Sequence, residues 1–192
     1  MSERLKISGF TCILGACIDR FCTTGYREPL SVEARLELAA KVHGLRGVEL
    51  LYPTELSSTN VAVVKDKIRA LNLEMVGIMV DLFSDRKWMN GSFTNPDKNR
   101  RAEAIRLTKE TIDMAKNLGV PRVEIWPGQD GFDYPFETDY EKAWRWMIEG
   151  LRECAEYDRK IQLCLEYKPK EPRKRIFLGS AGKVLLITNE TV

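Results

Sequence analysis

Short apolar runs alternate with longer segments of helical periodicity, and this alternation constrains the fold more than any other feature of the sequence. Apolar residues three or four positions apart follow each run, as amphipathic helices require. Such regular alternation, with no hairpin signal between neighbouring runs, predicts a parallel sheet covered by helices. The fold class expected is therefore α/β, built from about five parallel βα repeats. The strands are expected at residues 5–10, 48–52, 75–82, 122–126 and 161–167.

Capping residues mark the ends of the expected helices. Ser31 is expected to cap the first helix, and Asn95 is expected to cap a long helix that ends before Gly119. Thr138 begins a capping-box pattern for the helix that follows. Gly47 is expected in the turn that leads into the second strand. The remaining boundaries follow from apolar spacing, and they give helices over residues 59–71, 95–118, 138–157 and 181–188.

Two architectures fit a series of parallel βα units. One is an open doubly wound sheet, and the other is part of a (βα)8 barrel, which normally needs about 250 residues and eight units. The 192 residues of this chain favour the open sheet on length alone. Neither GxGxxG nor GxxxxGK[ST] follows the first strand, so a nucleotide-binding version of the open sheet lacks its usual signature.

Composition excludes several classes of protein. The formal net charge is +2 with both signs mixed along the chain, so we expect no nucleic-acid partner. The densest basic run, residues 168–175, is expected to be a solvated loop. The sequence has no apolar stretch near the ~20 residues of a membrane span and no secretory signal pattern, so no membrane association is expected. Five cysteines without a CxxC pair are expected to be reduced thiols of a cytoplasmic protein.

The last expected strand places a carboxylate and an ammonium at its carboxyl end. Because side chains alternate along a strand, Glu166 and Lys168 share a face with Gln162 and Cys164, and the apolar face is expected to contact helices. Ligands bind at the carboxyl ends of strands in both architectures. Glu166 offers an oxygen ligand suited to Mg²⁺ or Mn²⁺, and Lys168 can polarise or protonate a substrate oxygen. A structural ion pair between the two residues is the alternative.

Aromatic residues end two other strands in equivalent places. Trp126 is the last residue of the fourth expected strand, and Phe83 stands at the end of the third. Each side chain is either a flat apolar wall against a sugar ring or a core residue. His43, the only histidine, lies beside Gly44, and it is expected to be a C-terminal helix residue rather than a catalytic base.

Two segments resemble one known family. Residues 93–131, FTNPDKNRRAEAIRLTKETIDMAKNLGVPRVEIWPGQDG, look like the corresponding stretch of xylose isomerases and of the wider xylose isomerase-like barrel superfamily. Residues 165–172, LEYKPKEP, are similar to the EPKPNEP segment of that family. The two motifs occur in the family's order and at a compatible separation. The resemblance covers most of this chain but only about five-eighths of an eight-unit barrel.

This resemblance implies a fold, a function and a set of site residues. The fold implied is a single domain over residues 1–192, an incomplete (βα)8 TIM barrel truncated after its fifth βα unit. The function implied is a metal-dependent ketose–aldose isomerase or epimerase that acts on a small sugar. Glu166 corresponds to the position of the family's first carboxylate ligand of the divalent metal, Mg²⁺ or Mn²⁺. Lys168 falls on the lysine that contacts the sugar oxygen, and Trp126 and Phe83 fall on aromatic residues that line the sugar site.

The sequence also departs from the family pattern. Xylose isomerases carry a catalytic histidine after the second strand, whereas residues 48–56 here, VELLYPTEL, contain none, which puts xylose as the substrate in doubt. The family's other metal ligands come from strands six to eight, and one carboxylate alone cannot hold Mg²⁺. A non-catalytic fragment that self-associates or needs a complementing C-terminal half is therefore an alternative, and exposed sheet edges favour a homo-oligomer. A sugar-binding module is another alternative. A zinc-dependent abasic-site endonuclease is disfavoured because it needs several histidines.

Overall fold

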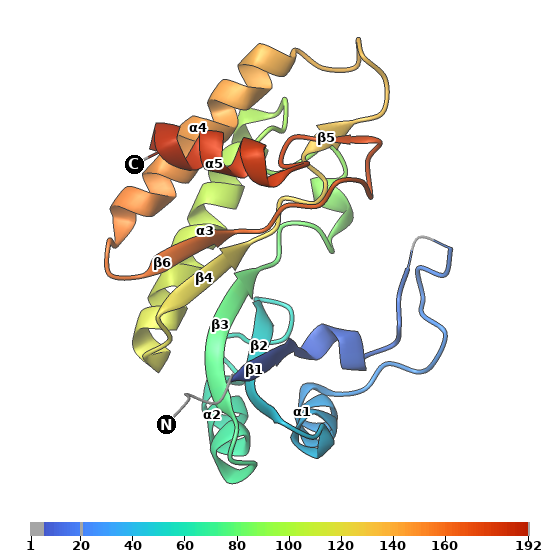
Figure 1. Cartoon of the computed structure of the whole chain (residues 1–192), viewed down its shortest axis with the longest axis vertical. Helices are drawn as coiled ribbons and strands as arrows, with labels where there is room; N and C mark the ends of the chain where they lie inside the picture. The colour runs from blue at the N-terminus through green and yellow to red at the C-terminus, as the bar shows by residue number, and fades with distance from the viewer. Residues whose placement is uncertain (1–5, 20, 192) are drawn as a thin grey trace. The chain divides into compact units, whose positions relative to one another are not determined.

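The computed structural model describes residues 6–19 and 21–191 (Figure 1). They form two compact units, one that ends at Met79 and one that begins at Val80. Leu5, expected at the start of the first strand, lies outside the described residues. The first unit contains strands β1 (Ile7–Phe10) and β2 (Leu45–Tyr52) and all but the last residue of β3 (Glu74–Val80). It also contains a 3₁₀ turn η1 (Thr11–Leu14) and helices α1 (Val32–Lys41) and α2 (Val61–Ala70).

The three strands of the first unit follow the order β1-β2-β3, and β1 runs parallel to β2. Ser31 caps α1 as expected, because its hydroxyl accepts a hydrogen bond of 3.2 Å from the amide of Ala34. The turn expected at Gly47 is wrong, since Gly47 lies inside β2 and is the register partner of Ser8. A Cβ at Gly47 would come within 2.8 Å of Val76 and 2.9 Å of Ser8. Neighbouring side chains therefore require glycine there.

The second unit continues the alternation of strand and helix. Its helices are α3 (Lys98–Leu118), α4 (Tyr140–Tyr157) and α5 (Ala181–Thr191), with a 3₁₀ turn η2 (Arg86–Trp88) before α3. Helix α3 packs against α4, and α4 packs against α5 (Figure 1). Strands β4 (Arg122–Ile125) and β6 (Gln162–Leu165) pair in parallel. A short antiparallel pair, β5 (Gly131–Phe132) with β7 (Arg175–Ile176), was not expected from the sequence.

Two of the expected helix caps are wrong by one or two residues. The residue that caps α3 is Asp97, whose carboxylate accepts from the amide of Asn99 at 2.8 Å. Asn95 is buried instead, and its side chain bonds the backbone of Gly91 and Asp97. Helix α4 is capped by Asp139 rather than by Thr138. In each case an aspartate nearer the helix supplies the acceptor.

The end of α3 and the faces of β6 agree with the sequence. Gly119 ends α3 in the left-handed conformation, with φ of 71°. The apolar face of β6 is on the side of the helices, because Leu163 and Leu165 line a groove together with Leu151 of α4 and Thr188 of α5. The opposite face of β6 therefore carries Gln162, Cys164 and the charged residues that follow them.

Candidate functional site

Phe83 and Trp126 contact each other beyond the carboxyl ends of β3 and β4. Their ring centroids lie 4.7 Å apart, and the rings meet edge to face at 64°. Both residues are partly buried. The geometry is the one that aromatic quadrupoles favour, so each ring restrains the other. The structure thus brings together the two aromatic residues that the sequence analysis assigned to a sugar site.

Gly128 allows the backbone to lie directly against the Trp126 indole. A Cβ built on Gly128 would lie 2.4 Å from Cζ2 of Trp126 and 2.5 Å from its Cη2, far inside contact distance. The turn after β4 therefore wraps closely around one side of the indole. The indole Nε1 is buried and has no hydrogen-bond partner among the described residues. Packing rather than a polar contact therefore places this ring.

Lys168 follows β6, and its ammonium faces the same indole. Its Nζ lies 5.3 Å from the centroid of the Trp126 ring, within the range of a cation–π interaction. The ion pair recorded for Lys168 is a 3.6 Å contact with Glu171, and the lysine side chain is 43% exposed. An ammonium held over an aromatic wall and still open to solvent can donate hydrogen bonds to a bound ligand.

Glu166 lies at the end of β6 and is exposed. Its amide donates a 3.0 Å hydrogen bond to the carbonyl of Ile125, which extends the β4–β6 pairing by one residue. Within residues 6–19 and 21–191, no group of three or more His, Cys, Asp or Glu residues could hold a metal ion. The residues present do not make a complete site for Mg²⁺ or Mn²⁺, which take several oxygen ligands. The role of Glu166 as a metal ligand stays a prediction.

Asp130 is a fully buried carboxylate that the sequence analysis did not single out. It accepts hydrogen bonds from the amide and hydroxyl of Ser92, at 2.9 and 2.5 Å, and from those of Thr94, at 2.6 and 2.7 Å. Burial raises the pKa of Asp130, and the four donors act in the opposite direction. The PGQDG sequence around Asp130 indicated only a loop. The donors that bind the Asp130 carboxylate come from a segment some 36 residues earlier, so no local pattern points to them.

The basic run at residues 168–175 is more ordered than a freely solvated loop. Arg173 pairs with Asp133 at 3.2 Å, and the amide of Lys174 donates to the same carboxylate at 3.0 Å. These two contacts lower the pKa of Asp133. The Lys174 ammonium also lies 5.1 Å from the Tyr134 ring. Lys174 is exposed, as expected of a solvated loop, whereas Arg173 is half-buried and paired with Asp133, so the expectation is wrong for Arg173.

His43 and Glu55 both lie in the first unit. His43 is exposed and lies in the turn after α1, which ends at Lys41, so it follows the helix instead of belonging to its last turn as expected. Glu55, in the segment where the family carries a histidine, is 3% exposed. Its carboxylate pairs with Arg35 and accepts from the hydroxyl of Thr11 at 3.0 Å and the amide of Leu51 at 2.9 Å. Glu55 therefore holds the first unit together.

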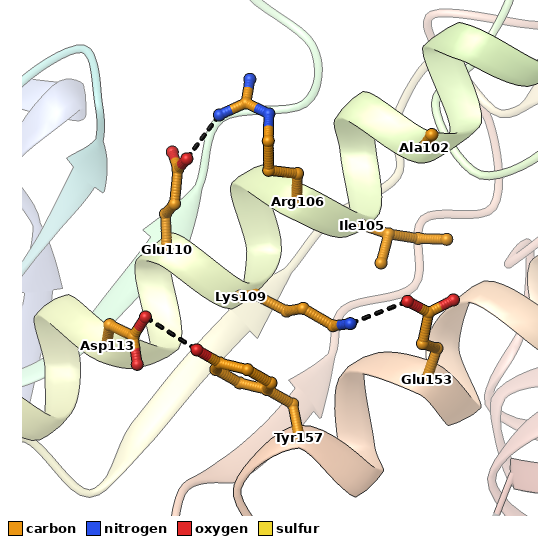
Figure 2. Close-up of a pocket in the computed structure, with 8 residues that line it drawn as sticks. All are labelled: Ala102, Ile105, Arg106, Lys109, Glu110, Asp113, Glu153 and Tyr157. Atoms are coloured by element: carbon orange, nitrogen blue, oxygen red, sulfur yellow. Dashed lines mark hydrogen bonds and ion pairs between the residues drawn. The ribbon is translucent and has the colours of Figure 1, made fainter.

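A groove of about 420 Å³ lies between α3 and α4, away from these strand ends (Figure 2). Its polar side chains are engaged with one another. Lys109 pairs with Glu153 at 2.7 Å, and the hydroxyl of Tyr157 donates to Asp113 at 2.9 Å (Figure 2). Mutually satisfied groups of this kind tie two helices together, so we assign this groove a structural role.

The sequence matches the model of one protein family, described as a xylose isomerase-like TIM barrel, over residues 36–184. Since the match covers well over half of the chain, the protein belongs to the xylose isomerase-like TIM barrel family. A relative of known function is the xylose isomerase of Thermus thermophilus, 33% identical over 125 residues. Those residues make up 63% of this chain and 32% of the relative, so the chain spans about a third of that enzyme.

Solved structures of similar shape confirm the fold class. The D-allulose 3-epimerase of Methylomonas sp., in complex with D-allulose, superposes on 98% of this chain and 59% of its own, with a TM-score of 0.69 and 16% identity. A xylose isomerase-like TIM barrel protein of Mycobacterium smegmatis, in complex with magnesium, covers 97% of this chain and 61% of its own, with a TM-score of 0.64 and 14% identity. The chain is therefore part of a TIM barrel built from parallel βα repeats, rather than an open doubly wound sheet.

No helix in residues 6–19 or 21–191 combines the length and the apolar composition that crossing a bilayer requires.

Proposed function

We propose that this chain carries the sugar-contacting part of a sugar isomerase or epimerase. The observation that supports the proposal most directly is the cluster of Lys168, Trp126 and Phe83 at the carboxyl ends of neighbouring βα units. Ligands bind at this end of TIM barrels. The family relatives named above act on sugars, as their names state. The substrate class proposed is therefore a small ketose or aldose.

The three side chains have complementary roles in this proposal. The flat faces of Trp126 and Phe83 cover the apolar C–H surface of a sugar and exclude water from it. The Lys168 ammonium donates a hydrogen bond to a sugar hydroxyl or carbonyl oxygen and stabilises negative charge that develops there. Movement of hydrogen between adjacent carbons places such charge on an oxygen. Lys168 is accordingly the residue proposed to be catalytic, and the two aromatic residues bind substrate.

A divalent metal, Mg²⁺ or Mn²⁺, would polarise the sugar oxygens in such a reaction. Glu166 is the one residue we propose as a ligand, because its carboxylate follows β6 at the same strand end as Lys168. The described residues supply no complete ligand set around it. The proposal for Glu166 is therefore limited to one contact with the metal.

The experiment that tests this function is calorimetric titration of the chain with D-allulose and with D-xylose, with and without Mn²⁺. Saturable binding of one sugar, lost in Trp126→Ala and retained in the control Trp146→Ala, is expected. Turnover of the bound sugar distinguishes an enzyme from a sugar-binding module. Absence of binding of both sugars to the folded chain would overturn the proposal.

A second candidate is a non-catalytic fragment that self-associates. The observation that favours it is the place of β6, which ends the strand order of its sheet among the described residues. A groove of about 290 Å³ beside β6 is lined by Leu151, Leu163 and Leu165. An open strand edge beside apolar side chains promotes association. Sedimentation that shows a monomer up to high concentration would contradict this candidate.

A further inference from the structure

Asp130 joins three segments of the second unit. Its carboxylate bonds Ser92 and Thr94, which lie in the segment between β3 and α3. Its carbonyl accepts a 3.0 Å hydrogen bond from the amide of Phe177, in the segment between β7 and α5. Its amide donates to the carbonyl of Pro127 at 3.0 Å and so closes the turn after β4. One residue thus sets the relative positions of three segments around the candidate site.

The bonding pattern requires a carboxylate at position 130. All four groups that meet the side chain act as donors toward it, two amides and two hydroxyls. Each carboxylate oxygen accepts from one backbone amide and one hydroxyl. In an asparagine, the side-chain NH₂ group would face one of these amide–hydroxyl pairs, and the backbone amide there can only donate, so two donors would oppose each other. Gly91 leaves room for this arrangement, because a Cβ there would lie 2.8 Å from the Thr94 hydroxyl and 3.1 Å from Oδ1 of Asp130.

The turn that Asp130 closes is the turn that packs against the Trp126 indole. Gly128 lies between Pro127 and Asp130, and it approaches the ring too closely for any side chain. Movement of the turn therefore moves the surface that confines the indole. The segment that holds Ser92 and Thr94 also contains Phe83, whose ring meets the indole edge to face. Asp130 consequently links both neighbours of Trp126.

We propose that Asp130 is a positioning residue that fixes the Trp126 indole in its place under Lys168 and beside Phe83. The claim about the indole is independent of any ligand, whereas its consequence for sugar affinity rests on the function proposed above. Loss of the Asp130 contacts frees the turn at Gly128, so that the indole becomes more mobile and more exposed to water. Asp130 itself is fully buried, and it acts only through the residues that it holds.

The test compares two threonine substitutions in the full chain. Thr94→Val removes the hydroxyl that donates to Asp130, and Thr111→Val removes a buried hydroxyl of α3 that donates to the carbonyl of Leu107 at 2.8 Å. The emission of Trp126 is obtained as the difference between each protein and its Trp126→Phe counterpart. A red shift of this emission and stronger quenching by acrylamide are expected in Thr94→Val and in Asp130→Asn, and neither change is expected in Thr111→Val.

Two results would overturn the proposal. One is a folded Thr94→Val protein in which the Trp126 emission and quenching are those of the parent. The other is an equal change in Thr111→Val, which would show a general loss of stability rather than positioning. If Asp130→Asn does not fold, Thr94→Val alone decides. Titration with D-allulose separates the two claims, because a red shift without sugar binding in the parent chain supports positioning and contradicts the proposed function.

Discussion

The Lys168 ammonium lies 5.3 Å from the centroid of the Trp126 ring. This contact joins the end of β6 to the end of β4, and Phe83 extends it to the end of β3 through the ring contact at 4.7 Å. A cation over an aromatic wall gives the site one charged donor and one apolar surface. Sugars present both kinds of surface, hydroxyl groups and C–H faces, so the pair matches their chemistry.

Replacement of Lys168 by methionine should weaken sugar binding with little effect on folding. The side chain is 43% exposed, so the free energy of unfolding should change by no more than about 0.5 kcal/mol. Loss of a charged hydrogen bond to the sugar should lower D-allulose affinity by about tenfold or more. Calorimetric titration measures the affinity. Lys170→Met, at an exposed position of the same segment, is the matched control and should bind as the parent does.

Substitution of Gly128 by alanine should destabilise the second unit, because the new Cβ would lie 2.4 Å from the Trp126 ring. Overpacking of this kind costs about 1–3 kcal/mol. Urea denaturation measures the cost. The control is Gly182→Ala in α5, where a Cβ meets only the Ser180 hydroxyl at 3.9 Å and alanine favours the helix. Equal stabilities of the two variants would show that the turn at Gly128 moves away without cost.

Glu103 should contribute to the loss of stability in acid. Its carboxylate bonds Lys87 at 2.8 Å and Arg100 at 2.7 Å, and the bond to Lys87 lowers its pKa below the ordinary 4.5. The contribution is therefore present above pH 4.5 and is lost as the pH falls through the lower, folded-state pKa. Glu103→Gln should remove about 1 kcal/mol or less at pH 7 and flatten the curve of stability against pH below 4.5.

The control for that measurement is Glu149→Gln, at an exposed position of α4. Its curve of unfolding free energy against pH, from urea titrations, should follow that of the parent chain. A Glu103→Gln curve that keeps the full acid slope of the parent would contradict the assignment.

Cys154 should resist thiol reagents in the folded chain. Burial raises the pKa of this thiol to about 12, so almost none of it is thiolate at pH 8. Cys12 and Cys17 are exposed and should react first. Cys154→Ala should leave the number of fast-reacting thiols unchanged, as counted with a chromogenic disulfide. Labelling of Cys154 at the rate of Cys12 would show that α4 opens readily at this position.

Periodicity predicted the alternation of strand and helix, because the apolar spacing of each element is local to it. Local sequence does not decide the cap of α3, since Asn95 and Asp97 both carry suitable acceptors and the structure shows that Asp97 is the cap. The resemblance assigned Phe83, Trp126 and Lys168 to one site, and the structure brings their side chains together. The sequence did not predict a role for Asp130, because its hydrogen-bond donors, Ser92 and Thr94, lie in a segment distant along the chain and form no local motif with it.

The most direct test of the proposed sugar site is the indole N–H spectrum of the chain, labelled with ¹⁵N, during titration with D-allulose. The Trp126 resonance is assigned from its disappearance in Trp126→Phe. The account predicts that this resonance shifts in a saturable manner and that Lys168→Met abolishes the shift, while Lys170→Met preserves it. A Trp126 resonance that does not move at saturating sugar, or that moves equally in Lys168→Met, would contradict the assignment of Lys168 and Trp126 to a sugar site.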